Sequence, residues 1–236
     1  CVPLNADGSL METEVFGETY KGRALYDVME RYVRAAFDDA NPELAKRGRD
    51  LLWYMWLGEG SPLFAKSKMA TFELYLIAEK EARKEVKNSF YSYLDDERVM
   101  GGIFEDFGMD PETSRIVCGH VPVKVKDGED PVKCGGRVLT IDGGFSKAYQ
   151  PTTGIAGYTL ISNSYGFVLA AHEPLESMRA AVVNELDIHS SRKVVELVDK
   201  RTLVADTDNG SVLKQQIADL EELLEAYRCG ILAEKE

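Results

Sequence analysis

The chain lacks long apolar runs. Its 236 residues contain no stretch of about 18 apolar residues, the length that a membrane-spanning helix needs, and no secretory leader pattern. Cysteine is also sparse, because the four cysteines are widely scattered and too few for a disulfide scaffold: Cys1, Cys118, Cys134 and Cys229. We therefore expect a cytoplasmic protein with reduced thiols and no membrane contact.

Positive charge is in short supply as well. Lys and Arg total 28 against 40 Asp and Glu, which gives a formal net charge of -12 at pH 7. An acidic surface repels nucleic acid and anionic lipid, so neither is an expected partner. A phosphorylated ligand would have to be held by a local basic pocket.

The chain changes character near residue 110. With 44% hydrophobic residues it can bury a substantial core. Apolar residues at helical spacing predict helices in the first half at about 25–37, from Asn41-Pro42 to about 55, from near Ser67 to about 76, and from near Asp95 to Gly108. The second half predicts strands at about 115–119, 137–142, 158–163, 166–171, 193–198 and 201–205, a helix at about 174–184, and a final amphipathic helix through Leu213 and Tyr227. The connection 163–166 is typical of a hairpin and favours antiparallel pairing.

Two apolar runs in the second half end in residues that suit a ligand site. The first, Ile116–Pro122, ends in Gly-His-x-Pro and presents the imidazole of His120, a good ligand for a divalent metal. The second, Val138–Gly144, ends in Asp142 and two glycines that let a ligand approach the backbone closely. Both strand ends therefore look like parts of one site. Without further context, His120 could equally be a hydrogen-bonded structural histidine and Asp142 an ordinary turn residue.

These residues carry a resemblance that runs from the first residue nearly to the last. The chain resembles the class III fructose-1,6-bisphosphatases of bacteria, which are related to the calcineurin-like phosphoesterases. The most specific segment is Ile141–Gln150, Ile-Asp-Gly-Gly-Phe-Ser-Lys-Ala-Tyr-Gln. The other segments that carry the resemblance are Cys1–Ser9, Trp53–Gly58, Ser61–Glu73, Gly119–Pro122, Thr153–Tyr158 and Ala205–Asp208.

The resemblance implies that part of the enzyme lies upstream. In that family a metal-ligating His-Gly directly precedes the residues that match Cys1–Leu4, and the Asp-x-His, Gly-Asp-x-x-Asp and Gly-Asn-His-Glu ligand motifs lie further upstream. We therefore expect this chain to be the C-terminal portion of a longer enzyme, with its N-terminal half as a partner. The expected fold class is α+β, the C-terminal part of a two-sheet metallophosphatase sandwich with a helical insertion. Its expected parts are a loop at 1–16, the insertion at 17–110, and a β-rich part with a terminal helix at 111–236.

The implied chemistry is hydrolysis of fructose 1,6-bisphosphate by two divalent metals, with manganese the expected ion. His120 would hold one metal, and Asp142 would act at the reaction site or on substrate hydroxyls. The expected substrate contacts are Gly143, Gly144, Lys147 and Tyr149, together with Lys66 and Lys68 at an expected helix start. Alternatively, each of these lysine side chains is exposed to solvent and binds no substrate.

Other interpretations stay open. The neighbouring Cys118 and His120 could form a nucleophile pair, or a zinc cluster with Cys134, although no Cys-x-x-Cys spacing is present. The aromatic stripe of Trp53, Tyr54 and Trp56 favours core packing over sugar stacking. The chain could serve another calcineurin-like phosphatase or be a non-catalytic interaction module, and a homo-oligomer is left open.

Overall fold

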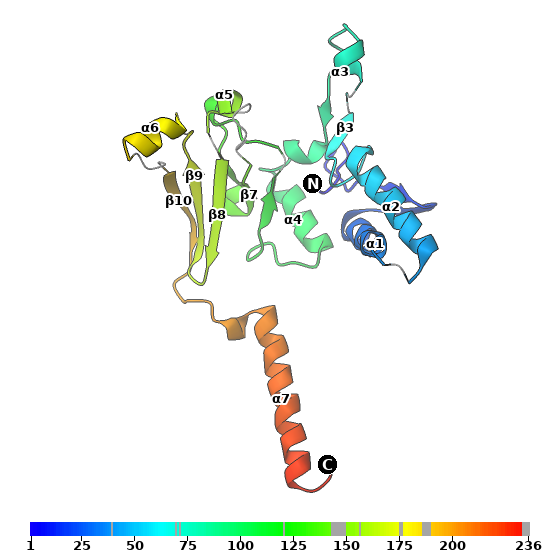
Figure 1. The fold of residues 1–236 in the computed structure, drawn as a ribbon, viewed down its shortest axis with the longest axis vertical. Helices are drawn as coiled ribbons and strands as arrows, with labels where there is room; N and C mark the ends of the chain where they lie inside the picture. Colours follow the sequence, from blue (N-terminus) through cyan, green and yellow to red (C-terminus); the bar gives the residue numbers. More distant parts are fainter. Residues whose placement is uncertain are drawn as a thin grey trace. The chain divides into compact units, whose positions relative to one another are not determined.

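The computed structural model describes residues 1–38, 40–68, 70, 72–119, 121–142, 150–155, 157–174, 177–185 and 190–232. The chain forms two compact units: unit 1 comprises Cys1–Gly144 with Thr152–Gly154, and unit 2 comprises Phe145–Pro151 with Ile155–Glu236. Helices and sheets occur together, so the structure is α+β (Figure 1), while the two-sheet sandwich stays a prediction. Among the described helices, none combines the length and the apolar character needed to cross a membrane.

Unit 1 begins with an ordered loop and a short hairpin. An isolated bridge joins Leu4 to Leu10, and strands β1 (Thr13–Val15) and β2 (Glu18–Tyr20) pair antiparallel. Phe16 and Gly17 between them both have positive φ, 52° and 89°, as a tight two-residue turn requires. The hairpin brings Val15 to the core of the helices that follow.

Helices α1 (Gly22–Ala35) and α2 (Pro42–Leu57) confirm the first two predicted helices. The Asn41 side chain accepts a hydrogen bond from the backbone N–H of Leu44, and Pro42 occupies the first turn. The two helices pack closely because a Cβ at Gly48 would lie only 2.2 Å from the carbonyl oxygen of Tyr32. Their shared core consists of Val15, Leu25, Val28, Met29, Tyr32 and Leu51.

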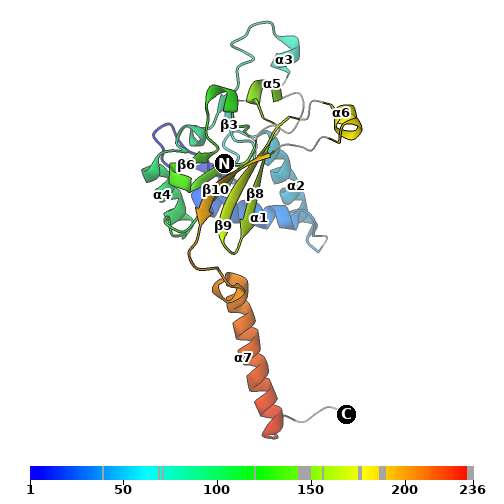
Figure 2. The same cartoon turned by 90° about the vertical axis from the view of Figure 1, so that its left-hand side faces the viewer.

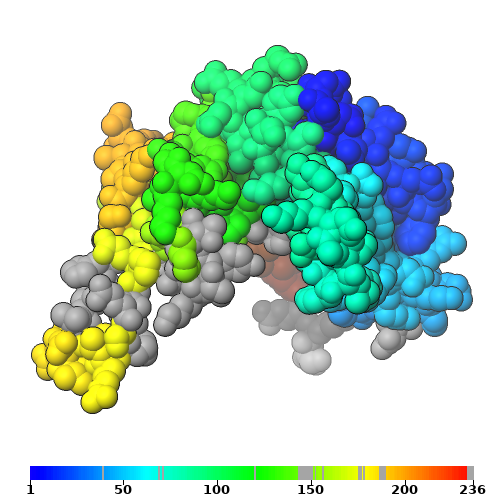
Figure 3. Space-filling view, turned by 90° about the horizontal axis from the view of Figure 1, so that it is seen from above, coloured from blue at the N-terminus to red at the C-terminus, as the bar shows by residue number. Residues whose placement is uncertain are grey.

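An arm of two short strands follows, where the sequence predicted a helix from Ser67. Strand β3 (Lys66–Lys68) pairs antiparallel with β4 (Val86–Lys87), and helix α3 spans only Glu73–Leu76. The predicted helix start at Ser67 is wrong. The apolar side chains with helical spacing are exposed, Phe72 by 74% and Tyr75 by 85%, so no neighbouring surface stabilises a longer helix. Figure 3 looks down on this arm, drawn in teal.

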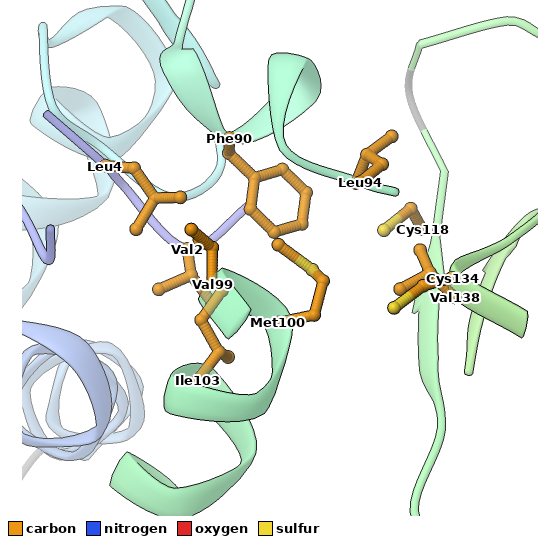
Figure 4. Close-up of a cluster of buried hydrophobic side chains, with 10 residues drawn as sticks. All are labelled: Val2, Leu4, Phe90, Leu94, Val99, Met100, Ile103, Cys118, Cys134 and Val138. Atoms are coloured by element: carbon orange, nitrogen blue, oxygen red, sulfur yellow. The ribbon is translucent and has the colours of Figure 1, made fainter. Parts of the chain in front are cut away.

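The main core of unit 1 surrounds helix α4 (Glu97–Asp106). The Asp96 side chain accepts a hydrogen bond from the backbone N–H of Val99 at 2.9 Å, and the positive φ of Gly108, 69°, ends the helix as predicted. A 3-10 turn at Ser89–Ser92 brings Phe90 into the same core. Figure 4 shows the cluster: Val2, Leu4, Phe90, Leu94, Val99, Met100, Ile103, Cys118, Cys134 and Val138.

A three-stranded sheet of order β5-β7-β6 completes unit 1. Its strands are β5 (Ile116–Cys118), β6 (Val132–Lys133) and β7 (Val138–Thr140). Strand β6 is antiparallel to β7, but β5 is parallel to β7, so the expectation of antiparallel pairing is wrong for that pair. Because the chain places β6 on the far side of β7 before turning back, β7 runs in the same direction as β5.

Unit 2 contains a sheet of order β10-β9-β8 (Figure 2), and its neighbouring strands pair antiparallel as predicted. Its strands are β8 (Gly157–Asn163), β9 (Gly166–His172) and β10 (Ser190–Leu197). Asn163 pairs with Gly166, which confirms the predicted hairpin. Short helices α5 (Gln150–Thr153) and α6 (Met178–Val183) flank these strands in the sequence.

The chain ends in helix α7 (Asp208–Arg228), which confirms the predicted terminal helix. The strand predicted at 201–205 is wrong, because a 3-10 turn, η4 (Val204–Asp206), occupies this segment. The Asp206 carboxylate accepts a hydrogen bond from the backbone N–H of Leu203 at 2.9 Å, and Thr207 then caps α7. The local side-chain bonds favour a capped turn over an extended strand.

Candidate functional site

The carboxyl ends of β5 and β7 lie at the same edge of their sheet, because the two strands are parallel. The backbone N–H of Ile141 donates to the carbonyl of Cys118 at 2.9 Å. Just beyond, the N–H of Val123 donates to the carbonyl of Asp142 at 2.7 Å. The structure therefore brings together the two strand ends that the sequence singled out.

The N-terminal loop reaches the same edge. A pocket of about 160 Å³ lies between this loop, strand β5 and the 3-10 turn at Ser89–Ser92. It is lined by Cys1, Val2, Tyr26, Phe90, Tyr91, Ile116, Val117, Cys118 and Gly119. The Tyr26 hydroxyl donates to the carbonyl of Cys1 at 2.7 Å, and the Cys1 nitrogen donates to the carbonyl of Pro62, also at 2.7 Å. These bonds hold Cys1 in the wall of the pocket that Gly119 also lines.

The tyrosine and cysteine side chains of β5 and its neighbours that line the pocket are neutral at pH 7. Burial raises the pKa of Tyr26 and of Tyr91 to about 12. Burial also raises the pKa of the Cys118 thiol. These groups supply packing and hydrogen bonding, and the charge needed to bind a phosphate must come from other residues.

The burial of Cys118 and Cys134 argues against the alternative in which these cysteines act as a nucleophile or as zinc ligands. The thiolate is the form that attacks and that binds zinc, and burial favours the neutral thiol at both Cys118 and Cys134. The part of the chain that the structure describes contains no group of three His, Cys, Asp or Glu side chains that could hold a metal. Burial thus disfavours the thiolate form at both cysteines, while the third member of the suggested cluster, His120, lies outside the described residues.

The predicted site residues divide into two groups. Asp142 is half-buried at the end of β7, within the edge just described. His120, Gly143, Gly144, Lys147 and Tyr149 lie outside the described residues. Their roles stay predictions.

Lys66 and Lys68 lie on strand β3 and not at a helix start. The Lys66 ammonium forms an ion pair with Glu85 at 2.5 Å, which lowers the pKa of that carboxyl group. The Lys68 ammonium donates to the carbonyl of Glu81 at 3.2 Å. Both lysines therefore contribute to the arm itself, and a phosphate would have to compete with these contacts.

Of the aromatic residues of α2, Tyr54 packs against the core shared with α1 as predicted, whereas the two tryptophans contradict the predicted core packing. Trp53 and Trp56 are 62% and 64% exposed and contact each other edge to face, with ring centroids 5.6 Å apart. The face of α2 that packs on α1 carries Ala45, Gly48 and Leu51 instead. The close approach at Gly48 leaves no room for indole rings between these helices.

Asn88 contributes to the site and is not evident from the sequence. It is 3% exposed, and its side-chain oxygen accepts hydrogen bonds from the backbone N–H groups of Leu4 and Phe90, each at 3.0 Å. Its amide nitrogen donates to the carbonyl of Leu4 at 3.4 Å. Asn88 therefore anchors the N-terminal loop that presents Cys1, and the 84 residues between the two partners hide this from any local pattern.

Comparison with known proteins gives consistent results over the whole chain. The model of the Firmicute fructose-1,6-bisphosphatase family matches residues 1–229. A protein named fructose-1,6-bisphosphatase class 3 from Clostridium botulinum (strain Hall) is 51% identical over 236 residues, which are 100% of this chain and 35% of that protein. The protein of the same name from Clostridium tetani is 49% identical over 237 residues, 99% of this chain and 36% of its own length. The chain thus spans about a third of the length of these relatives. No solved structure matches.

Proposed function

Because the chain belongs to the Firmicute fructose-1,6-bisphosphatase family, we propose that it is part of an enzyme that hydrolyses fructose 1,6-bisphosphate to fructose 6-phosphate and phosphate. The observation that carries the proposal is the meeting of three segments at one edge of a sheet: Cys1, the end of β5 and the end of β7. We place this reaction in gluconeogenesis and in the cytoplasm. The sparse, unpaired cysteines support a reducing compartment.

The metals belong to the proposal. The described residues alone do not supply a full set of ligands, but an imidazole from His120 and a carboxylate from Asp142 suit a divalent ion such as manganese. The resemblance adds a histidine before Cys1 and further ligands upstream. Two bound divalent ions would supply charge neutralisation and Lewis-acid activation of water. The longer protein, with its N-terminal half, is therefore the expected catalyst.

The substrate would be held by residues of this chain. Lys147 follows Gly143 and Gly144 in the sequence, so we propose that its ammonium and backbone N–H groups share one phosphate. Tyr149 would contact the sugar, and Lys66 and Lys68 are proposed for a phosphate at the arm. The neutral walls formed by Tyr26 and Tyr91 would exclude water without adding charge.

The proposal is tested by replacing His120 with Ala in the longer protein. We expect manganese content to fall and hydrolysis of the bisphosphate to drop by more than the 10–100-fold typical of residues that only orient a metal ligand. His172→Ala is the matched control, because His172 lies in β9 and its ring contacts the Thr159 hydroxyl at 2.8 Å. Unchanged metal content and near-normal turnover in His120→Ala would make His120 a structural histidine. Hydrolysis of other phosphoesters in place of the bisphosphate would point to another phosphatase of the same superfamily.

A further inference from the structure

Helix α7 carries an exposed apolar stripe. Its five members are between 43% and 63% exposed: Leu213, Ile217, Leu220, Leu224 and Tyr227. They are spaced by four, three, four and three residues, which puts them on one face of the helix. In the described part of this 21-residue helix the buried residue is Gly210, in the first turn.

The contacts of α7 with its own chain are concentrated at its first turn. The Thr207 side chain accepts a hydrogen bond from Gly210, and a Cβ at Gly210 would lie 1.9 Å from the carbonyl oxygen of Val204. These contacts fix the start of the helix on η4 but cover none of the stripe. A long helix draws most of its stability from packing an apolar face, so the stripe needs a partner helix.

We propose that α7 pairs antiparallel with α7 of a second copy of this chain. The alternating spacing of four and three residues is the pattern of a left-handed coiled coil, whose core is built from such a stripe. In the pairing that we infer, Leu213 packs against Leu224 of the second copy, and Ile217 packs against Leu220 of the second copy. Two-fold symmetry repeats both contacts, so two copies of the same surface suffice.

The charges beside the stripe select this pairing. It brings Lys214 next to Glu221 of the second copy, and symmetry repeats the ion pair. Shifting the antiparallel pairing by one heptad brings Glu221 against itself and Lys214 against Arg228, which is repulsive. A parallel pairing would set Lys214 beside Asn209 and Glu221 beside Gln216, so neither charge would find an opposite one.

The test uses the complete 236-residue chain and sedimentation equilibrium. We expect a dimer that Leu220→Asp converts to a monomer, whereas Ala218→Asp, on a face of α7 away from the stripe, leaves the dimer intact. Circular dichroism of both variants checks that α7 still folds. A monomeric parent chain, or a dimer that Leu220→Asp leaves unchanged, would overturn the proposal.

Charge exchange distinguishes this pairing from others. Lys214→Glu and Glu221→Lys should each raise the dimer dissociation constant roughly tenfold, because two attractive pairs become repulsive ones. The double variant restores both pairs in reversed sense and should dimerise nearly as tightly as the parent chain. Lys214 also donates to the carbonyl of Ala205 at 2.7 Å, a contact that Lys214→Glu and the double variant both lose and that Glu221→Lys keeps. Recovery of the double variant relative to Lys214→Glu can therefore come only from the exchanged charges. Failure of the double variant to recover would show that the stripe binds another helix or another register.

Discussion

Replacing Asn88 with Ala tests how the N-terminal loop is held at the site. The side chain of Asn88 bonds to Leu4 and Phe90, and both of these residues are 1% exposed. Alanine at position 88 would leave two buried backbone N–H groups without a partner. Water cannot readily replace the lost oxygen, because the surrounding residues form the main hydrophobic core of unit 1.

The expected cost follows from those two orphaned groups. A buried donor left without a partner costs about 1–3 kcal/mol, so we expect the two orphaned donors of Asn88→Ala to destabilise unit 1 by roughly 2–6 kcal/mol. The matched control is Asn41→Ala, because Asn41 makes one exposed capping bond, to the N–H of Leu44 at 3.1 Å. Loss of such a cap costs about 1 kcal/mol.

Urea unfolding measures the difference between the two variants. Both tryptophans of the chain, Trp53 and Trp56, lie in α2, so their fluorescence reports on unit 1 alone. Hydrogen exchange provides the local readout: Asn88→Ala should expose the amides of Leu4 and Met11 to solvent exchange, and Asn41→Ala should not. Equal destabilisation by the two variants, with the loop still protected, would refute the anchoring role of Asn88.

Three further predictions concern packing, ionisation and substrate binding. Gly48→Ala should lower the thermal unfolding temperature sharply, because its Cβ would meet the Tyr32 carbonyl at 2.2 Å; Gly101→Ala, with nothing within 4 Å, should be neutral or slightly stabilising. The pKa of Tyr26 is raised from 10.0 to about 12, so its contribution to stability is complete below pH 10 and is lost as the pH rises towards 12. Tyr26→Phe should therefore lose less stability than the parent chain over that pH range, as measured by urea unfolding; an unchanged pH dependence would count against a buried phenol. In the longer protein, Lys147→Ala should raise the KM for the bisphosphate more than that for a small aryl phosphate, and equal effects would remove Lys147 from the distal phosphate.

Local signals determined most of the helices. Asn41-Pro42 predicted the start of α2, the apolar spacing after residue 95 predicted α4, and Gly108 predicted its end. Each signal acts within one or two turns, because capping bonds and helical spacing join residues that are close in the chain. The same holds for the 163–166 hairpin, where the turn residues join neighbouring strands.

The family could also be identified from the sequence alone. The segments around His120 and Asp142 carried the resemblance, and the family match over residues 1–229 confirms it. These segments do not reveal what holds them together in space.

Only the tertiary structure decided how the site is assembled. The parallel pairing of β5 and β7 and the anchoring of Leu4 by Asn88 join segments that are far apart in the chain. The same applies to Lys66, which lies in a strand and not at a helix start because β4 pairs with this segment. It also applies to Trp53, which is exposed because smaller residues of α2 pack at the close crossing with α1. In each case the outcome depends on which distant surface is available for pairing or burial, and no local pattern of residues carries that information.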